Sequence, residues 1–271
     1  MARLTRRMLP RSESRYRTRR ARGATFFTST QAFGDLSIVV KRFPGPVGAR
    51  HEFVLVHGIG VSSRYFGPVA AELAKVGNVF LVDLPGYGAA PDPKRKVSIA
   101  DHAVVLGAFV SAARLDNAVI VGHSMGSQVV SQLAVQSPEV TEHVVLMAPT
   151  LPPRLRHFWR AVGALLRDGF REPLYGNLIA IGDYFIRCGI PYGLRQVPHL
   201  LTDRIEDRLP RITQKTLVIR GDRDPIVSDG WMRTVTDLIP GARSATVAGP
   251  HVIMYTDPVR VAALIANHAA S

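Results

Sequence analysis

Apolar runs and segments of helical periodicity alternate along most of the chain. Runs rich in β-branched and other apolar residues predict strands at 24–30, 36–43, 53–56, 78–82, 117–121, 143–147, 216–220 and 243–247. Apolar residues that recur every three or four positions predict helices at 64–76, 98–114, 229–238 and 257–269, and one more that starts within 127–135. Strands that alternate with helices usually pair in parallel, so the pattern predicts an α/β fold with a mostly parallel, eight-stranded sheet and helices on both faces.

The pattern divides the chain into three parts. The core of the fold is expected at 24–150 and 210–271. Residues 151–209 lack strand alternation and contain amphipathic helical stretches with aromatic residues, which predicts a helical cap, or lid, over the site. The apolar face of this cap indicates a small-to-medium hydrophobic substrate. Residues 1–23 are basic and lack an apolar pattern, so they are predicted to form a disordered tail.

The most informative stretch follows the strand predicted at 117–121. It reads Gly122-His123-Ser124-Met125-Gly126, a G-x-S-x-G pattern between a β-branched run and a helix. A serine hydroxyl is a poor nucleophile unless the backbone presents it sharply and a base removes its proton. Glycines two positions either side of Ser124 permit the tight strand-to-helix turn that presents it. Ser124 is therefore the candidate nucleophile.

Further candidate groups also come directly after predicted strands. Asp222 and Asp224 follow one strand, and His251 follows the last one. An earlier strand leads into His57-Gly58-Ile59-Gly60, a turn that can aim a backbone N–H at a developing oxyanion. Because right-handed crossovers bring the carboxyl ends of parallel strands to one edge of the sheet, these groups are expected to meet there.

With these motifs the chain resembles the α/β-hydrolase fold superfamily, in its serine-nucleophile, esterase- and lipase-like branch. The resemblance implies that Ser124 is the nucleophile and that His251 is the general base. It favours Asp224 as the acid that orients the histidine, with Asp222 as the alternative two positions earlier. A turn-forming role is open to either aspartate, because Asp residues commonly start turns.

The resemblance also implies an oxyanion hole built from the N–H groups of Ile59 and Met125. The segment from Asp83 to Gly88 looks like the D-x-x-G-x-G turn of the same superfamily. Two positions depart from its usual pattern. Ser127 stands where many members have glycine, and Pro250 stands where a polar or small residue often precedes the histidine. Both departures bear on substrate fit more than on chemistry.

The reaction implied is two-step acyl transfer that hydrolyses a carboxylic ester or related acyl bond. It requires no organic cofactor and no metal, and none is expected. Other activities stay open on the same fold: a C–C bond hydrolase, a perhydrolase or acyltransferase, and a ligand-binding protein without turnover. Epoxide hydrolases and haloalkane dehalogenases are disfavoured, because the nucleophile at their strand-to-helix turn is usually an aspartate, whereas this chain has Ser124 there.

Composition agrees with a globular enzyme. The chain has 271 residues and 46% hydrophobic content, enough for a large core. Its single cysteine, Cys188, excludes an internal disulfide and fits a reducing compartment, so a cytoplasmic location is expected. No apolar run is long enough for an integral membrane segment.

The charge of the chain is concentrated near its start. Residues 2–22 contain nine arginines and one glutamate, a local charge of +8 out of a net +13. Disorder without a specific role is the first interpretation of this tail. An organellar transit signal is a second, and contact with an anionic surface is a third. Nucleic acid is not the expected partner, since only the tail suggests it.

Overall fold

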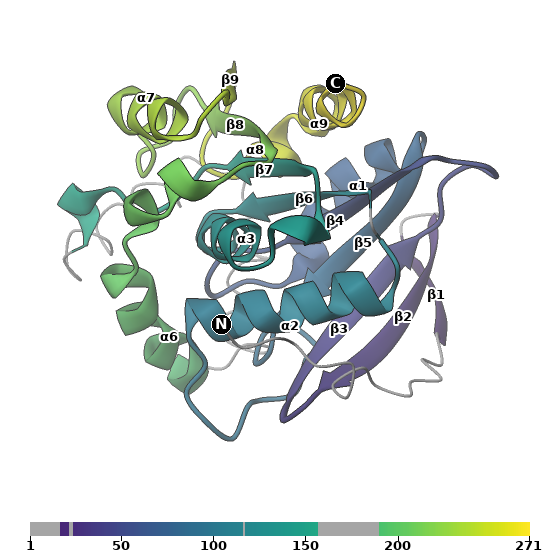
Figure 1. Cartoon of the computed structure of the whole chain (residues 1–271). Coiled ribbons are helices and arrows are strands. Elements are labelled where there is room, and N and C mark those ends of the chain that lie inside the picture. The colour runs from purple at the N-terminus through teal and green to yellow at the C-terminus, as the bar shows by residue number, and fades with distance from the viewer. Residues whose placement is uncertain (1–16, 22–23, 116, 157–189) are drawn as a thin grey trace.

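The computed structural model describes residues 17–21, 24–115, 117–156 and 190–271. Within them, nine strands form one sheet, and β1 and β9 lie at its opposite ends (Figure 1). The strands are β1 (Arg17–Ala21), β2 (Ala24–Phe33), β3 (Leu36–Phe43), β4 (His51–Val56), β5 (Gly77–Asp83), β6 (Ala118–His123), β7 (His143–Met147), β8 (Lys215–Gly221) and β9 (Arg243–Val247).

The sheet has the order β1-β2-β3-β5-β4-β6-β7-β8-β9. The pairs β1–β2, β2–β3 and β3–β5 are antiparallel, and every pair from β5 to β9 is parallel. The predicted α/β fold with a mostly parallel sheet is therefore confirmed. The carboxyl ends of β4, β6, β8 and β9, which precede the candidate site loops, meet along one edge.

Strand β1 corrects one expectation. The sequence pattern assigns residues 1–23 to a disordered tail, but Arg17–Ala21 form a ninth strand that pairs with β2 from Arg17↔Thr28 to Ala21↔Ala24. The high charge of this segment hides the strand in the hydrophobic pattern of the sequence. Strand pairing uses backbone N–H and C=O groups, so an edge strand tolerates charged side chains that a central strand does not.

Helices cover both faces of the sheet (Figure 1). One face carries α2, α3, α6 and α7, and the other carries α1, α8 and α9. None of the helices in the described ranges is both long enough and apolar enough to cross a bilayer. Their bounds are α1 (Gly67–Leu73), α2 (Ile99–Ala112), α3 (Met125–Gln136), α6 (Ile190–Thr202), α7 (Asp229–Leu238), α8 (Ile253–Thr256) and α9 (Pro258–Ala269).

The central strands are buried on both faces, as their unbroken apolar runs predict. In β4, Phe53 and Leu55 join the core under α1 and α9, whereas Val54 and Val56 join the core under α2 and α3. All four side chains are fully buried. Successive side chains of a strand point to opposite faces, so one apolar run supplies both cores.

Polar residues set where several helices begin. Ser98 accepts the N–H of Asp101, and the Asp101 carboxylate accepts the N–H of Ser98 in return, a capping box that starts α2. The Ser228 side chain caps α7 by accepting the N–H of Trp231, without a bond in return. These caps satisfy N–H groups that the first turn of a helix leaves without partners.

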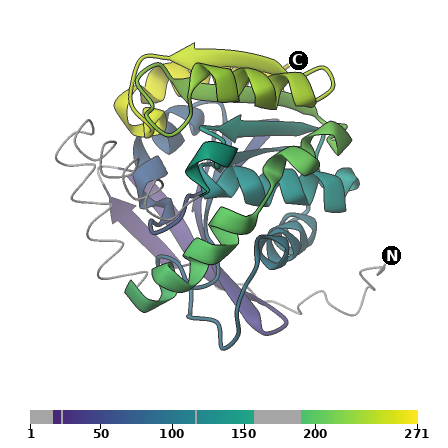
Figure 2. The same cartoon turned by 90° about the vertical axis from the view of Figure 1, so that its left-hand side faces the viewer.

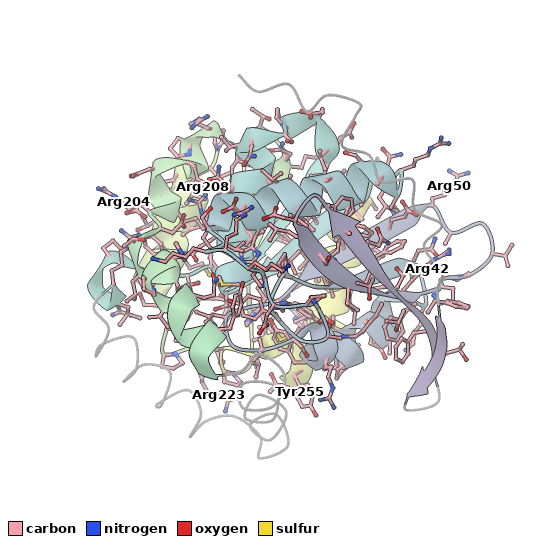
Figure 3. All side chains as sticks on the ribbon, turned by 90° about the horizontal axis from the view of Figure 1, so that it is seen from below. Arg42, Arg50, Arg204, Arg208, Arg223 and Tyr255 are labelled. Atoms are coloured by element: carbon pink, nitrogen blue, oxygen red, sulfur yellow. The ribbon has the colours of Figure 1, made fainter. Side chains whose placement is uncertain are left out.

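The described part of the predicted cap, within 151–209, is helical and contains no strand. Its main element, α6, crosses the side of the molecule that faces the viewer in Figure 2. The Gln128 side chain of α3 donates to the carbonyl of Leu200 in α6. Beyond α6, Arg208, which is labelled in Figure 3, donates to Ser131 of α3 at 2.9 Å and pairs with Asp203 at 2.7 Å. The predicted cap residues 157–189, with Cys188, lie outside the described residues.

Candidate active site

Ser124 occupies a strained turn between β6 and α3. Its φ is 55° and its ψ is −120°, a region that residues other than glycine rarely adopt. The N–H of Ser124 donates to the carbonyl of Met147 in β7 at 3.0 Å, which holds the turn on the sheet. The sharp strand-to-helix turn that the G-x-S-x-G pattern predicts is present.

The two glycines of the pattern are required by close backbone contacts. A Cβ atom on Gly122 would lie 2.3 Å from the carbonyl oxygen of Gly126. A Cβ atom on Gly126 would lie 2.2 Å from the carbonyl oxygen of Val56 in β4. Ser127, the first departure from the superfamily pattern, is fully buried, and its hydroxyl donates to the carbonyl of Gly122 at 2.8 Å. This hydroxyl therefore supports the turn.

His251 and Asp224 form a buried pair. Nδ1 of His251 lies 2.7 Å from Oδ2 of Asp224, and the two residues are 5% and 7% exposed. The other carboxylate oxygen accepts the N–H groups of Ile226 and Val227 at 2.8 and 2.9 Å. A carboxylate only accepts hydrogen bonds, so the histidine proton lies on Nδ1, and Nε2 is the unprotonated nitrogen that can act as a base.

Asp222, the alternative acid, has a different partner. Its carboxylate accepts the N–H of Gly249 at 2.8 Å, and this bond is the main cause that lowers the pKa of Asp222 below its usual value. Its side chain is half-exposed. Asp222 thus anchors the loop that precedes His251, while Asp224 contacts the imidazole ring itself.

A chain of hydrogen bonds runs beneath the turn through Tyr65 and His123. The N–H of Gly58 donates to the Tyr65 hydroxyl at 2.9 Å, and that hydroxyl lies 2.8 Å from Nδ1 of His123. Nε2 of His123 lies 3.1 Å from the carbonyl oxygen of His251. The carbonyl only accepts, so Nε2 carries the proton and Nδ1 accepts from Tyr65. Sequence reasoning missed Tyr65, because nothing in its spacing connects it to a histidine 58 positions away.

His123 is held neutral in this chain. Burial is the largest cause that lowers its pKa well below the usual value, and the neighbouring His251 lowers it further. The rings of His123 and His251 lie 4.7 Å apart between centroids. A neutral His123 can accept from Tyr65 and donate to the loop of His251 at the same time.

The His57 side chain connects the turn at His57–Gly60 to Leu84, the residue directly after β5. Nε2 of His57 accepts the N–H of Leu84, so Nδ1 carries the proton and donates to the carbonyl of Gly58 at 2.7 Å. A Cβ atom on Gly58 would lie 3.1 Å from Cβ of Ser124, so this turn runs directly beside the candidate nucleophile.

Asp83, at the end of β5, organises the predicted D-x-x-G-x-G turn. Its carboxylate accepts from Lys41 at 2.9 Å and from the N–H groups of Ser63 and Ala89 at 2.8 and 3.1 Å. A Cβ atom on Gly88 would lie 2.5 Å from its Cγ. Burial by itself raises the pKa of Asp83, but the charge and hydrogen bond of Lys41, with smaller contributions from His57 and Ser63, outweigh it. Asp83 is a fully buried anion that fixes the neighbouring loops.

The structure thus brings the predicted site residues to one sheet edge. Ser124 adjoins the turn that contains Ile59, and His123 links the serine turn to the loop of His251. Asp224 contacts His251 directly. No cluster of three or more His, Cys, Asp or Glu side chains with metal-binding geometry occurs in the described ranges.

Known sequences share much of this chain. The sequence model of the alpha/beta hydrolase family matches residues 53–264. Pimeloyl-(acyl-carrier protein) methyl ester esterase of Aeromonas hydrophila is 24% identical over 238 residues, which cover 78% of this chain and 91% of that protein. An uncharacterized Mycobacterium tuberculosis protein is 33% identical over 101 residues, or 37% of this chain, and the match spans 30% of that relative's length.

Solved structures share the fold. The enol-lactonase of Burkholderia xenovorans superposes with a TM-score of 0.77 at 18% identity, over 89% of this chain and 100% of that one. E-2-(acetamidomethylene)succinate hydrolase gives the same TM-score and identity over 91% of this chain and 100% of that one. The family match covers most of the chain and the fold agrees with it, so this chain belongs to the alpha/beta hydrolase family.

Proposed function

We propose that this protein is a serine hydrolase that cleaves carboxylic ester or related acyl bonds of a small-to-medium hydrophobic substrate. The observation that carries the proposal is the buried His251–Asp224 pair at the same sheet edge as a serine held at φ 55°. The pair leaves Nε2 of His251 as the base, and the strained turn presents the Ser124 hydroxyl.

In the first step, Oγ of Ser124 attacks the carbonyl carbon of the ester while Nε2 of His251 takes its proton. Asp224 stabilises the imidazolium that forms. The carbon–oxygen bond to the leaving group then breaks, and the alcohol leaves with the proton from His251. In the second step, water gives a proton to His251 and attacks the acyl-serine. The acid product leaves, and the proton returns to Ser124.

We assign the oxyanion hole to the N–H groups of Ile59 and Met125. The neighbouring donors are already used, since the N–H of Gly58 binds Tyr65 and the N–H of Ser124 binds Met147. No turn or loop bond between described backbone groups uses the N–H of Ile59 or Met125. Met125 starts α3, where N–H groups point out of the helix end. One such donor contributes about 3–4 kcal/mol to the transition state.

The ester assignment is supported by relatives whose names specify ester bonds. One is the Aeromonas hydrophila methyl ester esterase, and another is the enol-lactonase that shares the fold. The reaction as written needs no metal and no cofactor. A cytoplasmic location and contact of the basic tail with anionic surfaces remain predictions from the sequence.

The test is hydrolysis of p-nitrophenyl esters from acetate to long acyl chains, beside the Ser124→Ala variant. We expect turnover in the native chain and a fall of about 10⁶-fold in kcat for Ser124→Ala, with unchanged circular dichroism. Full activity in a folded Ser124→Ala variant would refute the nucleophile assignment. Labelling of Ser124 by a fluorophosphonate without ester turnover would favour the C–C hydrolase alternative, and neither signal would favour a ligand-binding protein.

A further inference from the structure

A buried arginine lies behind the loop that carries Asp224. Arg220 is the next-to-last residue of β8 and is 4% exposed. Successive side chains of a strand point to opposite faces, so Arg220 shares a face with Val218, whose side chain packs in the core on the α7 side of the sheet (Figure 1). Removing a guanidinium from water is costly unless the fold supplies hydrogen-bond partners for it. The partners of Arg220 therefore indicate what it does there.

Both partners of the guanidinium belong to the end of the 222–228 loop and the start of α7. Nη1 of Arg220 donates to the carbonyl of Val227 at 2.9 Å, and Nη2 pairs with the carboxylate of Asp229, the first residue of α7. The bond to Val227 is buried, whereas the Asp229 side chain is 66% exposed. One side chain thus ties the end of the loop to the strand from which the loop starts.

Val227 connects this arginine to the acid. The N–H of Val227 donates to Oδ1 of Asp224 at 2.9 Å, beside the N–H of Ile226 at 2.8 Å. Oδ2 of the same carboxylate lies 2.7 Å from Nδ1 of His251. The two oxygens belong to one rigid, planar group, so a shift of Val227 that turns Oδ1 also turns Oδ2 away from the imidazole. The position of Val227 therefore sets the angle at which Asp224 meets His251.

The start of the loop is fixed by a separate set of bonds. The Asp222 carboxylate accepts the N–H of Gly249 at 2.8 Å, and the N–H of Arg223 donates to the carbonyl of Gly249 at 3.0 Å. These bonds join the start of the loop to the segment that precedes His251. Arg220 acts at the opposite end, through Val227. Asp224 lies between the two anchors, so its carboxylate depends on both.

We propose that Arg220 is a positioning residue for the acid, which holds the end of the loop so that Asp224 stays aligned with His251 during the reaction. The inference rests on the proposed function and deepens it. A planar guanidinium presents donors in two directions at once, so it serves a backbone carbonyl and a carboxylate together. An ammonium group keeps the charge without this fixed fork of donors.

The first experiment is a double-mutant cycle on ester hydrolysis. We expect Arg220→Met to lower kcat about 10–100-fold with little change in KM, because Asp224 loses its alignment with His251. In the Asp224→Asn background, the same change should lower kcat less than about threefold, since an effect carried by Asp224 disappears with its carboxylate. Equal fold-losses in the two backgrounds, or native kcat in folded Arg220→Met, overturn the proposal.

Three further variants separate alignment from charge and from loss of a buried arginine. Arg220→Lys repeats the cycle in a chain that keeps the charge, and its loss in kcat should also disappear in the Asp224→Asn background. Asp229→Asn removes only the exposed ion pair and should lower kcat less than about threefold. Arg208→Met is the matched control for burial, because Arg208 likewise binds a backbone carbonyl and an aspartate, but far along the chain from the acid loop.

The second experiment follows the proton between His251 and Asp224 by NMR, without substrate. A proton in a short hydrogen bond to a carboxylate gives a low-field signal, and its loss in His251→Gln assigns it. We expect this signal in the native chain and in Arg208→Met, and its loss or upfield shift in Arg220→Met. An unchanged signal in Arg220→Met, or no such signal in the native chain, overturns the proposal.

The two experiments also distinguish the positioning role from the proposed function. A signal that depends on Arg220, with no ester turnover in the native chain, would refute the proposed hydrolysis and retain the positioning role. Ester turnover with an unchanged signal and equal losses in both backgrounds would refute the positioning role and retain the proposed hydrolysis.

Discussion

Two aspartates two positions apart differ in what they touch, and this difference decides which residue has which role. Asp224 contacts the imidazole of His251 and accepts two backbone N–H groups. Asp222 accepts the N–H of Gly249 and is half-exposed. Sequence spacing favours Asp224 only by resemblance, whereas its contact with His251 supplies a physical reason for the same choice.

We therefore expect Asp224→Asn to lower kcat by about 10³–10⁴-fold, because an amide no longer holds the histidine proton on Nδ1. Asp222→Asn should lower kcat less than about tenfold, since its amide oxygen still accepts from Gly249. Ester hydrolysis by the two purified variants gives the comparison. The opposite ranking would show that Asp222, and not Asp224, is the acid that orients His251.

The Tyr65 hydroxyl is the residue-scale feature that connects the site loops. We expect Tyr65→Phe to lower kcat about tenfold with little change in KM, because Gly58 and His123 lose the oxygen that sets their positions. Unfolding free energy should fall by about 1–3 kcal/mol. Tyr255→Phe, which removes a hydroxyl outside this chain of bonds, is the control.

A purely structural role for Tyr65 would lower stability without changing kcat in the folded fraction. The rate at which a fluorophosphonate labels Ser124 separates the two cases, because it reports nucleophile activation directly. An unchanged labelling rate in Tyr65→Phe would show that the hydroxyl has no positioning role.

At the scale of elements, the serine turn depends on how closely β6, α3 and β4 pass one another. Gly126, in the first turn of α3, lies against the backbone of β4, and Gly122, next to the last residue of β6, lies against the backbone of α3. Neither contact is with a flexible side chain that could move aside. The strained φ of Ser124 is thus imposed by three elements together.

Gly126→Ala should consequently destabilise the fold by more than about 3 kcal/mol, because its Cβ would lie 2.2 Å from the carbonyl oxygen of Val56. Gly230→Ala, in α7 where nothing lies within 4 Å of the added atom, should be neutral or stabilising by up to about 1 kcal/mol. Denaturant unfolding of both variants measures the difference. Similar stabilities for the two would contradict the close approach of α3 and β4.

At the scale of the whole molecule, burial of histidines makes stability depend on pH. Burial is the largest cause that lowers the pKa of His102, which falls to about 3, and the neighbouring His57 contributes to the same shift. Burial likewise lowers the pKa of His268 to about 4. Between the folded value and the unfolded value near 6.5, the unfolded chain binds a proton that the folded chain does not. Stability contributed by these neutral histidines is present above pH 6.5 and is lost as pH falls.

For His102 alone the loss between pH 6.5 and 4 is about 3 kcal/mol. We expect His102→Leu to match the native chain in stability near pH 7.5 and to exceed it at pH 4.5, because leucine has no proton to gain. Thermal unfolding across this range measures both chains. Parallel pH curves would mean that His102 is not held neutral by the fold.

The sequence by itself determined the alternation of strands and helices, the G-x-S-x-G turn and the Ser-Asp-His order. These are local properties, since hydrophobic period, glycine placement and motif spacing act within a few residues. The same reasoning predicted disorder at Arg17–Ala21, where a backbone ladder with β2 forms instead. A ladder depends on the partner strand, which local charge does not reveal.

Only the tertiary structure decided how distant residues divide their roles. In it, Asp224 contacts His251, whereas Asp222 accepts a hydrogen bond from Gly249. The Tyr65 hydroxyl connects Gly58 to His123. The tertiary structure also brought Tyr192 of α6 to the loop after β5, where its hydroxyl donates to the carbonyl of Pro85. Each of these contacts is made between segments far apart in the chain. Their geometry follows from how the sheet and helices pack, because side-chain hydrogen bonds require positions that only the folded backbone sets.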